Sequence, residues 1–389
     1  MAARKRASSR AIATATDTDT SKSETPTSQE HADPPIAPPK SGLIFKLCLF
    51  FAIPYFYLLF YHYKIESELQ RSILINAGLS LAGFFITQKM IPVASRYVLR
   101  RNLFGYDINK KGTPQGTIKV PESLGIVVGA VFLVLAILFQ YFNFTADSNW
   151  LVEYNAALAS ICFMLLLGFV DDVLDVPWRV KLILPSFAAL PLLMAYAGHT
   201  SIIIPKPLVP YVGLEILDLG WIYKLYMFLL AVFCTNSINI HAGLNGLEVG
   251  QTVVIASAIL LHNIMQIGAS LDPEYKQAHA FSIYLVQPLL ATSLALFSYN
   301  WYPSSVFVGD TYTYFAGMTM AVVGILGHFR FNPQTGLLTG TNDGTLVNFF
   351  LRLFGKMSEG SLCAALLVFQ AIACCLCFVL RYFLTGWYK

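Results

Sequence analysis

Residues 225–271 read LYMFLLAVFCTNSINIHAGLNGLEVGQTVVIASAILLHNIMQIGASL, and Glu248 is the single charged side chain among them. A helix rises about 1.5 Å per residue, so about 20 apolar residues cross the hydrocarbon core of a membrane. Each such run must be helical in lipid, because an unpaired backbone group there costs several kcal/mol. The stretch therefore predicts two membrane-spanning helices joined by a short turn.

The same pattern continues outward over most of the chain. The 389 residues are 56% hydrophobic and 12% charged, whereas soluble domains are about 25% charged. This composition excludes both a soluble globular protein and a disordered chain, and it predicts an all-α, polytopic transmembrane bundle of about ten helices over residues 43–389. Ten stretches without Asp, Glu, Lys or Arg define these helices: 47–63, 72–88, 123–146, 154–170, 182–205, 225–247, 249–271, 277–309, 311–329 and 360–380. The longest, 277–309, calls for a helix plus a re-entrant or interfacial piece.

The two ends of the chain and the basic loops predict the orientation. Residues 1–42 are rich in Ser, Thr, Ala and Pro and predict a disordered tail rather than a cleavable signal. Segments 1–46 and 89–122 carry seven basic residues each, while 64–71 and 147–153 carry two together. The excess of Lys and Arg places the tail and the 89–122 loop in the cytosol. The net charge of +4 gives no case for nucleic acid.

Two adjacent carboxylates, Asp171 and Asp172, end the fourth apolar stretch. Negative charges at a helix C-terminus oppose the helix dipole, so stabilisation of their own helix does not explain them. An ordinary solvated loop is the alternative to a functional site. Asp175, Trp178 and Lys181 follow, and for Trp178 and Lys181 the alternative is an anchor at the membrane interface.

Polar amides end the sixth apolar stretch, in the sequence TNSINIHAGLNGLE of residues 235–248. Asn236 and Asn239 are three residues apart and share a face of a helix. Gly243 and Gly246 indicate that the helix breaks there. A polar pocket is favoured over the alternative, which is hydrogen bonding between helices.

One carboxylate, Asp310, stands between two long apolar runs. It is the only acidic residue between Lys276 and Arg330, and no Lys or Arg lies between those two. Because Asp310 has no cation near it in sequence, a metal ion is the obvious partner, and a helix N-cap is the alternative. For Asp107 and Glu122, in the basic loop, the alternative is capping and turn chemistry.

The predicted topology brings these polar groups to one face of the membrane. Carboxylates, amides and a lysine without thiols suit Mg²⁺, which takes oxygen ligands and shares them with substrate phosphates. The residues expected at this face are Asp107, Glu122, Asp171, Asp172, Lys181, Asn239, Asn245 and Asp310.

Several long segments resemble the polyprenyl-phosphate N-acetylhexosamine-1-phosphate transferases, on the eukaryotic branch of that family. The segments are IPVASRYVLRRNLFGYD (91–107), LLLGFVDDVLDVPWRVKLILP (165–185), AVFCTNSINIHAGLNGLEVGQ (231–251) and NWYPSSVFVGDTYTYFAGMTMAVVGILGHF (300–329). The resemblance implies transfer of GlcNAc-1-phosphate from UDP-GlcNAc to dolichyl phosphate, with release of UMP. It further implies a multi-pass protein of the endoplasmic reticulum membrane with a cytosolic active site, acting at the first step of lipid-linked oligosaccharide assembly for N-glycosylation, and a homodimer.

The resemblance also implies roles for individual residues. Asp171, Asp172, Lys181 and Asp310 would be catalytic, and Asn239 and Asp310 would bind Mg²⁺. The substrate-binding residues would be Tyr106, Asp107, Ile108, Glu122, Asp175, Trp178, Asn236, Asn245 and Phe307. The residues around the lipid phosphate would be Lys181, Val232, Phe233, Cys234, Thr235, Asn236, Ser237, Ile238, Asn239 and Ile240.

The chain departs from the family pattern after Phe329. Gly327, His328 and Phe329 run directly into Arg330, where the family has a further helix and a basic loop with an Arg-His-Arg cluster. Losing one crossing places residues 330–359 on the lumenal side. An inactive or regulatory form is therefore one alternative to the transferase. An ion-coupled transporter is another, since Asn and Asp in broken helices also line transport sites.

Overall fold

Eight helices in the described part of the chain are long and apolar enough to cross a membrane. The structure is a computed structural model that describes residues 38–110, 112, 114–145, 148–196, 200–204, 206–240, 242–326 and 358–385. The helices are α1 (Ser41–Tyr57, continued by the π-helical turn η1, Leu58–His62), α2 (Ser67–Arg100), α3 (Gly125–Asn143), α4 (Asn149–Leu174), α8 (Trp221–Ile240), α9 (Leu247–Ala269), α10 (Pro273–Asn300) and α13 (Glu359–Thr385). The prediction of a polytopic helical bundle is confirmed.

Two of the predicted stretches are not among these eight helices. Stretch 182–205 falls into three short elements, α5 (Trp178–Ala188), α6 (Leu190–Ala195) and strand β3 (Ser201–Ile203). Pro185 lies inside α5, and α6 has a proline in its first turn. Stretch 311–329 forms α11 (Gly309–Leu326), which has 18 residues. The long stretch 277–309 ends its helix at Asn300 and continues as a loop, as its length predicted.

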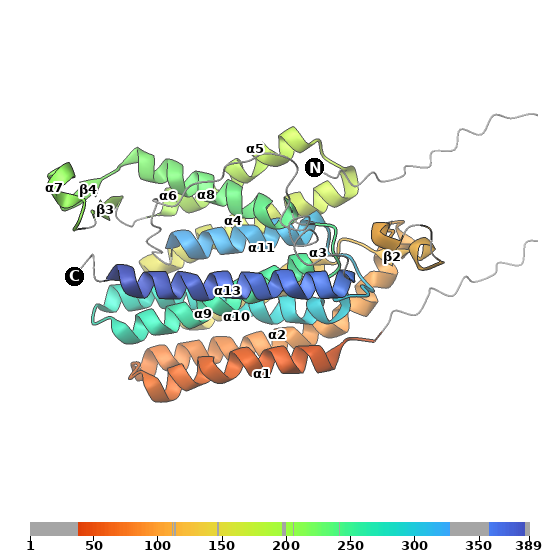
Figure 1. Cartoon of the computed structure of the whole chain (residues 1–389), viewed down its shortest axis with the longest axis horizontal. Coiled ribbons are helices and arrows are strands. Elements are labelled where there is room, and N and C mark those ends of the chain that lie inside the picture. The colour runs from red at the N-terminus through yellow and green to blue at the C-terminus, as the bar shows by residue number, and fades with distance from the viewer. Residues whose placement is uncertain are drawn as a thin grey trace, which may run out of the picture.

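Short strands occupy the two ends of the bundle (Figure 1). At one end β1 (Phe104–Gly105) pairs antiparallel with β2 (Val120–Pro121), beside the 3₁₀ turns η2 (Ile108–Lys110) and η3 (Pro114–Thr117). At the other end β3 pairs antiparallel with β4 (Ile216–Asp218), beside the short helix α7 (Val209–Val212). The β1–β2 end therefore contains the basic loop of the sequence, and the functional candidates gather there.

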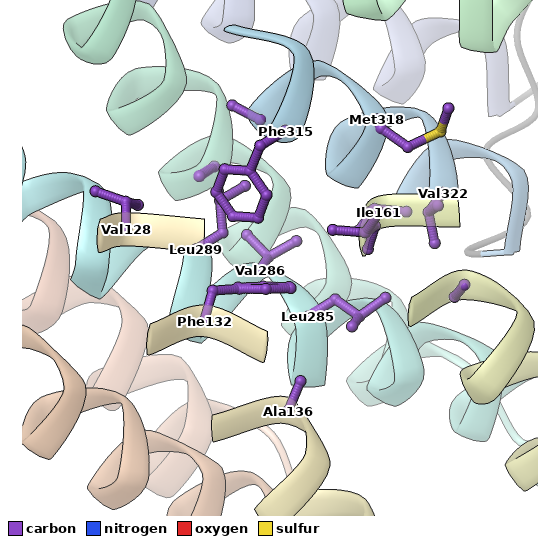
Figure 2. Packing of buried hydrophobic residues seen from close by; sticks show 14 of the residues in the cluster. Val128, Phe132, Ala136, Ile161, Leu285, Val286, Leu289, Phe315, Met318 and Val322 are labelled. Atoms are coloured by element: carbon purple, nitrogen blue, oxygen red, sulfur yellow. The ribbon is translucent and has the colours of Figure 1, made fainter. Parts of the chain in front are cut away.

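The core lies where α3, α4, α10 and α11 meet, as Figure 2 shows. Phe132 of α3 and Phe315 of α11 pack edge to face, with ring centroids 5.1 Å apart. Leu289 of α10 lies against them, and all three side chains are fully buried. This packing fixes α11, which carries Asp310, at the centre of the bundle.

Two glycines let α11 approach its neighbours at backbone distance. A Cβ on Gly168 of α4 would lie 2.6 Å from the Cα of Thr311, and a Cβ on Gly317 of α11 would lie 2.4 Å from the carbonyl oxygen of Cys234 on α8. Side chains there would separate the helices. The glycines therefore bring the C-terminus of α4 and the C-terminal half of α8 against the beginning of α11.

The last helix begins at the β1–β2 end of the bundle. The Glu359 carboxylate accepts hydrogen bonds from the Asn245 backbone N–H (2.8 Å) and from the Asn109 side chain (3.0 Å). The expectation that 330–359 lies on the opposite side is thus wrong for Glu359, because α13 starts on the same face as the Asn245 turn. The rest of that segment up to residue 357, like most of the predicted tail 1–42, lies outside the described residues.

Candidate active site

Asp172 caps the N-terminus of α11. Its Oδ1 accepts a hydrogen bond from the Asp310 N–H (2.7 Å), and its Oδ2 accepts from the Thr311 N–H (3.2 Å) and hydroxyl (2.5 Å). A carboxylate satisfies the unpaired N–H groups of a first helical turn and favours its positive dipole. The negative charge of Asp172 therefore opposes the dipole of its own helix, α4, and favours the dipole of α11. The cap that sequence offered as the alternative role for Asp310 therefore belongs to Asp172.

Lys181 joins the two remaining carboxylates. Its Nζ lies 2.8 Å from Asp171 Oδ2 and 2.9 Å from Asp310 Oδ2. The Tyr314 hydroxyl also donates to Asp171 Oδ2 (3.0 Å), and the Val176 N–H donates to Asp171 Oδ1 (3.0 Å). Asp171 is thus fixed on both oxygens, while Lys181 and Asp310 stay partly exposed, with 22% and 24% of their side-chain surface accessible.

The neighbouring carboxylates keep Lys181 charged. Burial lowers its pKa, but the hydrogen bonds and negative charges of Asp171 and Asp310 outweigh burial and hold the pKa above its ordinary value. Asp310 lacks a basic neighbour in sequence, yet its partner is a lysine 129 residues earlier in the chain. Asp310 thus has a cationic partner from the protein itself, and the metal ion expected from the sequence stays a prediction.

A second polar cluster lies on the same face, around Asn245. The Asn245 side chain donates to Asp107 Oδ2 (2.9 Å), and Lys110 pairs with the same oxygen (3.1 Å). Glu359 closes the cluster from the other side through the Asn245 N–H. The sequence analysis predicted Asp107 and Asn245 but missed Glu359 and Lys110. An acidic residue in the first turn of the last helix was the available signal for Glu359, and it has an ordinary structural meaning.

Phe307 and Glu122 form a wall beside this cluster. The Phe307 N–H donates to the Pro121 carbonyl (2.8 Å), and the Leu124 N–H donates to the Phe307 carbonyl (3.3 Å). A Cβ on Gly105 would lie 3.1 Å from the Phe307 ring and 3.4 Å from Glu122 Oε2. The loop after α10 is therefore joined to both small strands, which brings Phe307 and Glu122 to one place; their substrate-binding roles stay predictions.

Comparison with known proteins fits this geometry. The model of glycosyl transferase family 4 matches residues 154–328. The chain is 44% identical to the UDP-N-acetylglucosamine–dolichyl-phosphate N-acetylglucosaminephosphotransferase of Dictyostelium discoideum, over 82% of this chain and 91% of that protein. Proteins with the same name are 33% identical in Leishmania amazonensis (79% of this chain, 92% of that protein) and 37% identical in Saccharomyces cerevisiae (69% and 65%).

The chain belongs to glycosyl transferase family 4. The resemblance read from the sequence segments is confirmed, and the matched region contains both the lysine–carboxylate cluster and Asn245. Its first matched residue, Tyr154, lies in α4, the helix that also carries the Asp171–Asp172 pair. The family match thus covers the helices that hold Lys181 and Asp310 together.

The predicted lipid-phosphate segment of this family member, 232–240, is an ordinary part of α8. Its polar side chains bond to their own helix: Thr235 to Ala231, Asn236 to Val232, and Ser237 to Cys234. Phe233 and Ile240 are exposed, with 64% and 76% of their surface accessible. Only part of the segment can therefore face the site across the α8–α11 contact. The substrate-binding role of Asn236 stays a prediction.

Four further predicted residues lie at the edges of the site. Asp175 ends α4 in the left-handed conformation (φ 53°) and is exposed. Trp178 begins α5, and Ile108 begins η2. Tyr106 is 47% exposed beside the Asp107 cluster. The predicted roles of these four residues stay predictions.

The donors present suit a hard divalent cation shared with substrate. Among the described residues no group of three or more His, Cys, Asp or Glu side chains could hold a metal by itself. Asn239 is half-buried on α8, and Thr235, one turn earlier, is 2.6 Å from a Cβ on Gly317. Asn239 and Asp310 therefore lie on the site side of this contact. By the helical rise, Asn239 is about 6 Å along α8 from Thr235, and Asp310 is about 10 Å along α11 from Gly317. An amide, a carboxylate and substrate phosphate oxygens are typical Mg²⁺ ligands.

Proposed function

We propose that this chain transfers GlcNAc-1-phosphate from UDP-GlcNAc to dolichyl phosphate, giving GlcNAc-diphosphodolichol and UMP. The names of its relatives support this reaction. The observation that carries the proposal is the position of Lys181, held by Asp171 and Asp310 where apolar helices end. A lipid phosphate and a water-soluble nucleotide meet at such a boundary, and a fixed cation there attracts both.

Lys181 and its carboxylates would act on the lipid phosphate. A phosphate monoester has a second pKa near 6, so the acceptor is mostly a dianion at neutral pH and needs little general base. The obstacle is the approach of one anion to another, and the Lys181 ammonium offsets that repulsion. Asp171 orients Lys181 and is the candidate acceptor for a residual proton, whereas Asp172 acts by holding α11.

The second cluster and the Phe307 wall would receive the sugar nucleotide. We place uridine near Asn245 and Phe307, with Tyr106, Asp107, Ile108 and Glu122 around the remainder. Asn239 and Asp310 would hold Mg²⁺, which supplies positive charge to the diphosphate and to the leaving UMP when bound. The Lys181 bond to one Asp310 oxygen leaves the other oxygen for this role.

We further propose that the site faces the cytosol from the endoplasmic reticulum membrane and that two copies form a homodimer. The basic residues Arg100, Arg101, Lys110 and Lys119, between the end of α2 and β2, lie at the β1–β2 end of the bundle and support the cytosolic orientation. The charged Asp107, Lys110 and Glu359 gather at the same end, as a site for a water-soluble substrate requires.

The departure after Phe329 favours one second candidate, an inactive or regulatory form. The family pattern has a basic loop after this point that contacts the sugar nucleotide, and this sequence lacks it. The chain then retains the lysine–carboxylate cluster but would bind nucleotide weakly. This candidate predicts a folded protein that yields no lipid product.

Doubly labelled substrate separates these functions. UDP-GlcNAc carrying ³H in the sugar and ³²P in the β-phosphate is incubated with membranes containing the chain, dolichyl phosphate and Mg²⁺. Transfer of GlcNAc-1-phosphate moves both labels into the butanol phase in equal amounts, and a chelator abolishes it. Tritium without ³²P would overturn the phosphotransfer assignment, and no label in lipid would support the inactive form.

A further inference from the structure

The loop between α10 and α11, residues 301–308, leads directly to Phe307 and Asp310. Two hydrogen bonds join this loop to the end of α10. The Asn300 side chain donates to the Val306 carbonyl (2.9 Å), and the Ser305 N–H donates to the Tyr299 carbonyl (2.9 Å). These bonds fold the α10–α11 loop back over the end of α10. They leave the carbonyl groups of its first turn pointing outward.

Lys40 binds these outward carbonyls. Its ammonium group donates to the carbonyl oxygen of Trp301 and to that of Pro303 (2.7 Å), and its backbone N–H donates to the Ser298 carbonyl (2.9 Å). The last carbonyls of a helix carry partial negative charge and attract an ammonium group, while burial and the charge of Lys110 lower the pKa of Lys40 to about 8. The residue just before α1 is thereby attached to the loop of a helix pair about 260 residues away.

Tyr302 of the same loop lies beside the polar cluster around Asn245. Lys110 Nζ lies 5.2 Å above the Tyr302 ring and 3.1 Å from Asp107. A Cβ on Gly360 would lie 3.1 Å from the Tyr302 ring, so the ring also touches the start of α13 beside Glu359. The turn at 301–303 therefore contacts Lys40 directly and, through Lys110 and Gly360, the Asp107–Asn245–Glu359 cluster.

We propose that Lys40 is a positioning residue for the sugar-nucleotide site, holding the α10–α11 loop so that Tyr302 and Phe307 keep their places beside Asp107 and Asn245. The inference rests on the proposed function, because it assigns the cluster to the nucleotide. Lys40 touches no reacting atom. It acts through the backbone of Trp301 and Pro303, and α1 becomes part of the binding apparatus instead of a membrane anchor alone.

Three variants of the full chain test this role. Lys40→Met keeps the length of the side chain but removes its donors, and Lys40→Arg restores donors and charge. Lys46→Met is the matched control, because Lys46 is an exposed lysine in α1, the helix that Lys40 precedes. The Kd for UDP-GlcNAc is measured on purified protein, and KM for each substrate is measured in the butanol assay.

Positioning predicts a selective effect on nucleotide. Lys40→Met should raise the Kd and KM for UDP-GlcNAc by roughly three- to tenfold, the effect of losing one hydrogen bond of typical net strength. The KM for dolichyl phosphate should stay unchanged, Lys40→Arg should recover most of the affinity, and Lys46→Met should match the unmodified chain.

The alternative outcomes are distinct. A lower kcat at unchanged Kd and KM would mean that Lys40 only docks α1, which overturns the inference. Nucleotide binding that weakens in Lys40→Met, in a chain that makes no lipid product, would support the inference while the proposed transfer fails. A chain that binds no UDP-GlcNAc in any form would overturn both.

Discussion

Asp171 and Asp172 are adjacent in sequence, yet they serve different partners. Asp171 binds Lys181 and Tyr314, while Asp172 caps α11. Successive residues of a helix point about 100° apart, so one carboxylate can turn toward α5 and the other toward α11. The same residue type at neighbouring positions therefore has one electrostatic and one architectural role.

Replacing Asp172 should affect stability more than substrate affinity. We expect Asp172→Ala to lower the free energy of unfolding by about 1–2 kcal/mol, the usual cost of losing an N-cap, and to lower turnover because Asp310 moves with the helix. Asp172→Asn should be milder, since one oxygen can still accept from the Asp310 N–H. Thermal unfolding in detergent measures the loss, and equal midpoints for Asp172→Ala and the parent chain would contradict the capping role.

Replacing Lys181 should abolish transfer while sparing the fold. We expect Lys181→Met to lower turnover by about 10²-fold or more, the scale seen when a group that stabilises developing charge is removed. Lys224→Met, at an exposed position of α8, is the control and should keep full turnover. Turnover above a tenth of the parent value in Lys181→Met would remove this lysine from the mechanism.

The charge of Lys181 also sets an expectation for pH. Its folded-state pKa lies above the ordinary value of 10.5, so its stabilising ion pairs are fully present below that value and are lost only as pH rises through the folded pKa. Between neutral pH and 10.5 we expect no difference in the pH dependence of unfolding between the parent chain and Lys181→Met. Parallel unfolding midpoints across this range check the expectation, and divergence between neutral pH and 10.5 would contradict it.

At the scale of helices, close approach decides where the site forms. Gly317 meets the α8 backbone, whereas Gly324, two turns further along α11, has Leu230 Cδ2 as its nearest neighbour, 3.7 Å from an added Cβ. A methyl group added at Gly317 would require the helices to separate or bend. A methyl group added at Gly324 would be at ordinary van der Waals distance from its neighbour. The two glycines of one helix thus offer a matched pair.

We expect Gly317→Ala to destabilise the protein by about 1–3 kcal/mol, the usual cost of overpacking, and to reduce turnover by moving Asp310 relative to α8. Gly324→Ala should be neutral or slightly stabilising, because alanine is the better helix former. Unfolding midpoints and turnover of the two variants are compared side by side. Equal effects in both would show that the α8–α11 contact does not position the site.

At the scale of the whole molecule, the end of α11 and the start of α13 lie at opposite ends of the bundle (Figure 1). These are the last described residue before Phe329, where the chain departs from the family pattern, and the first helix described after it. Helix α11 runs away from Asp310 to Leu326, while α13 starts beside Asn245. The predicted inversion of topology after Phe329 does not reach α13.

Thiol labelling tests this arrangement in sealed vesicles. In a background without the seven native cysteines, Ser358→Cys and Thr117→Cys should react with an impermeant thiol reagent from the same side. Leu271→Cys, 95% exposed in the α9–α10 turn, should react only from the other side. Modification of Ser358→Cys from the same side as Leu271→Cys would support the inverted topology that the sequence predicted and contradict the arrangement described here.

The amino-acid sequence alone determined the membrane fold and the choice of polar residues. Charge-free stretches must form helices in lipid, and the few carboxylates and amides among them stand out for the same reason. Hydropathy is a property of neighbours along the chain, so it located Asp171, Asp310, Asn245 and Asp107 without any knowledge of packing.

Only the tertiary structure decided which of these groups meet. Asp310 finds its cation 129 residues away in Lys181, Asp172 caps a helix other than its own, and Lys40 reaches a loop from the far end of the sequence. These pairings depend on how closely helices approach, which small residues such as Gly168 and Gly317 allow. No local pattern encodes that approach, because it arises from the surfaces of two helices packed together.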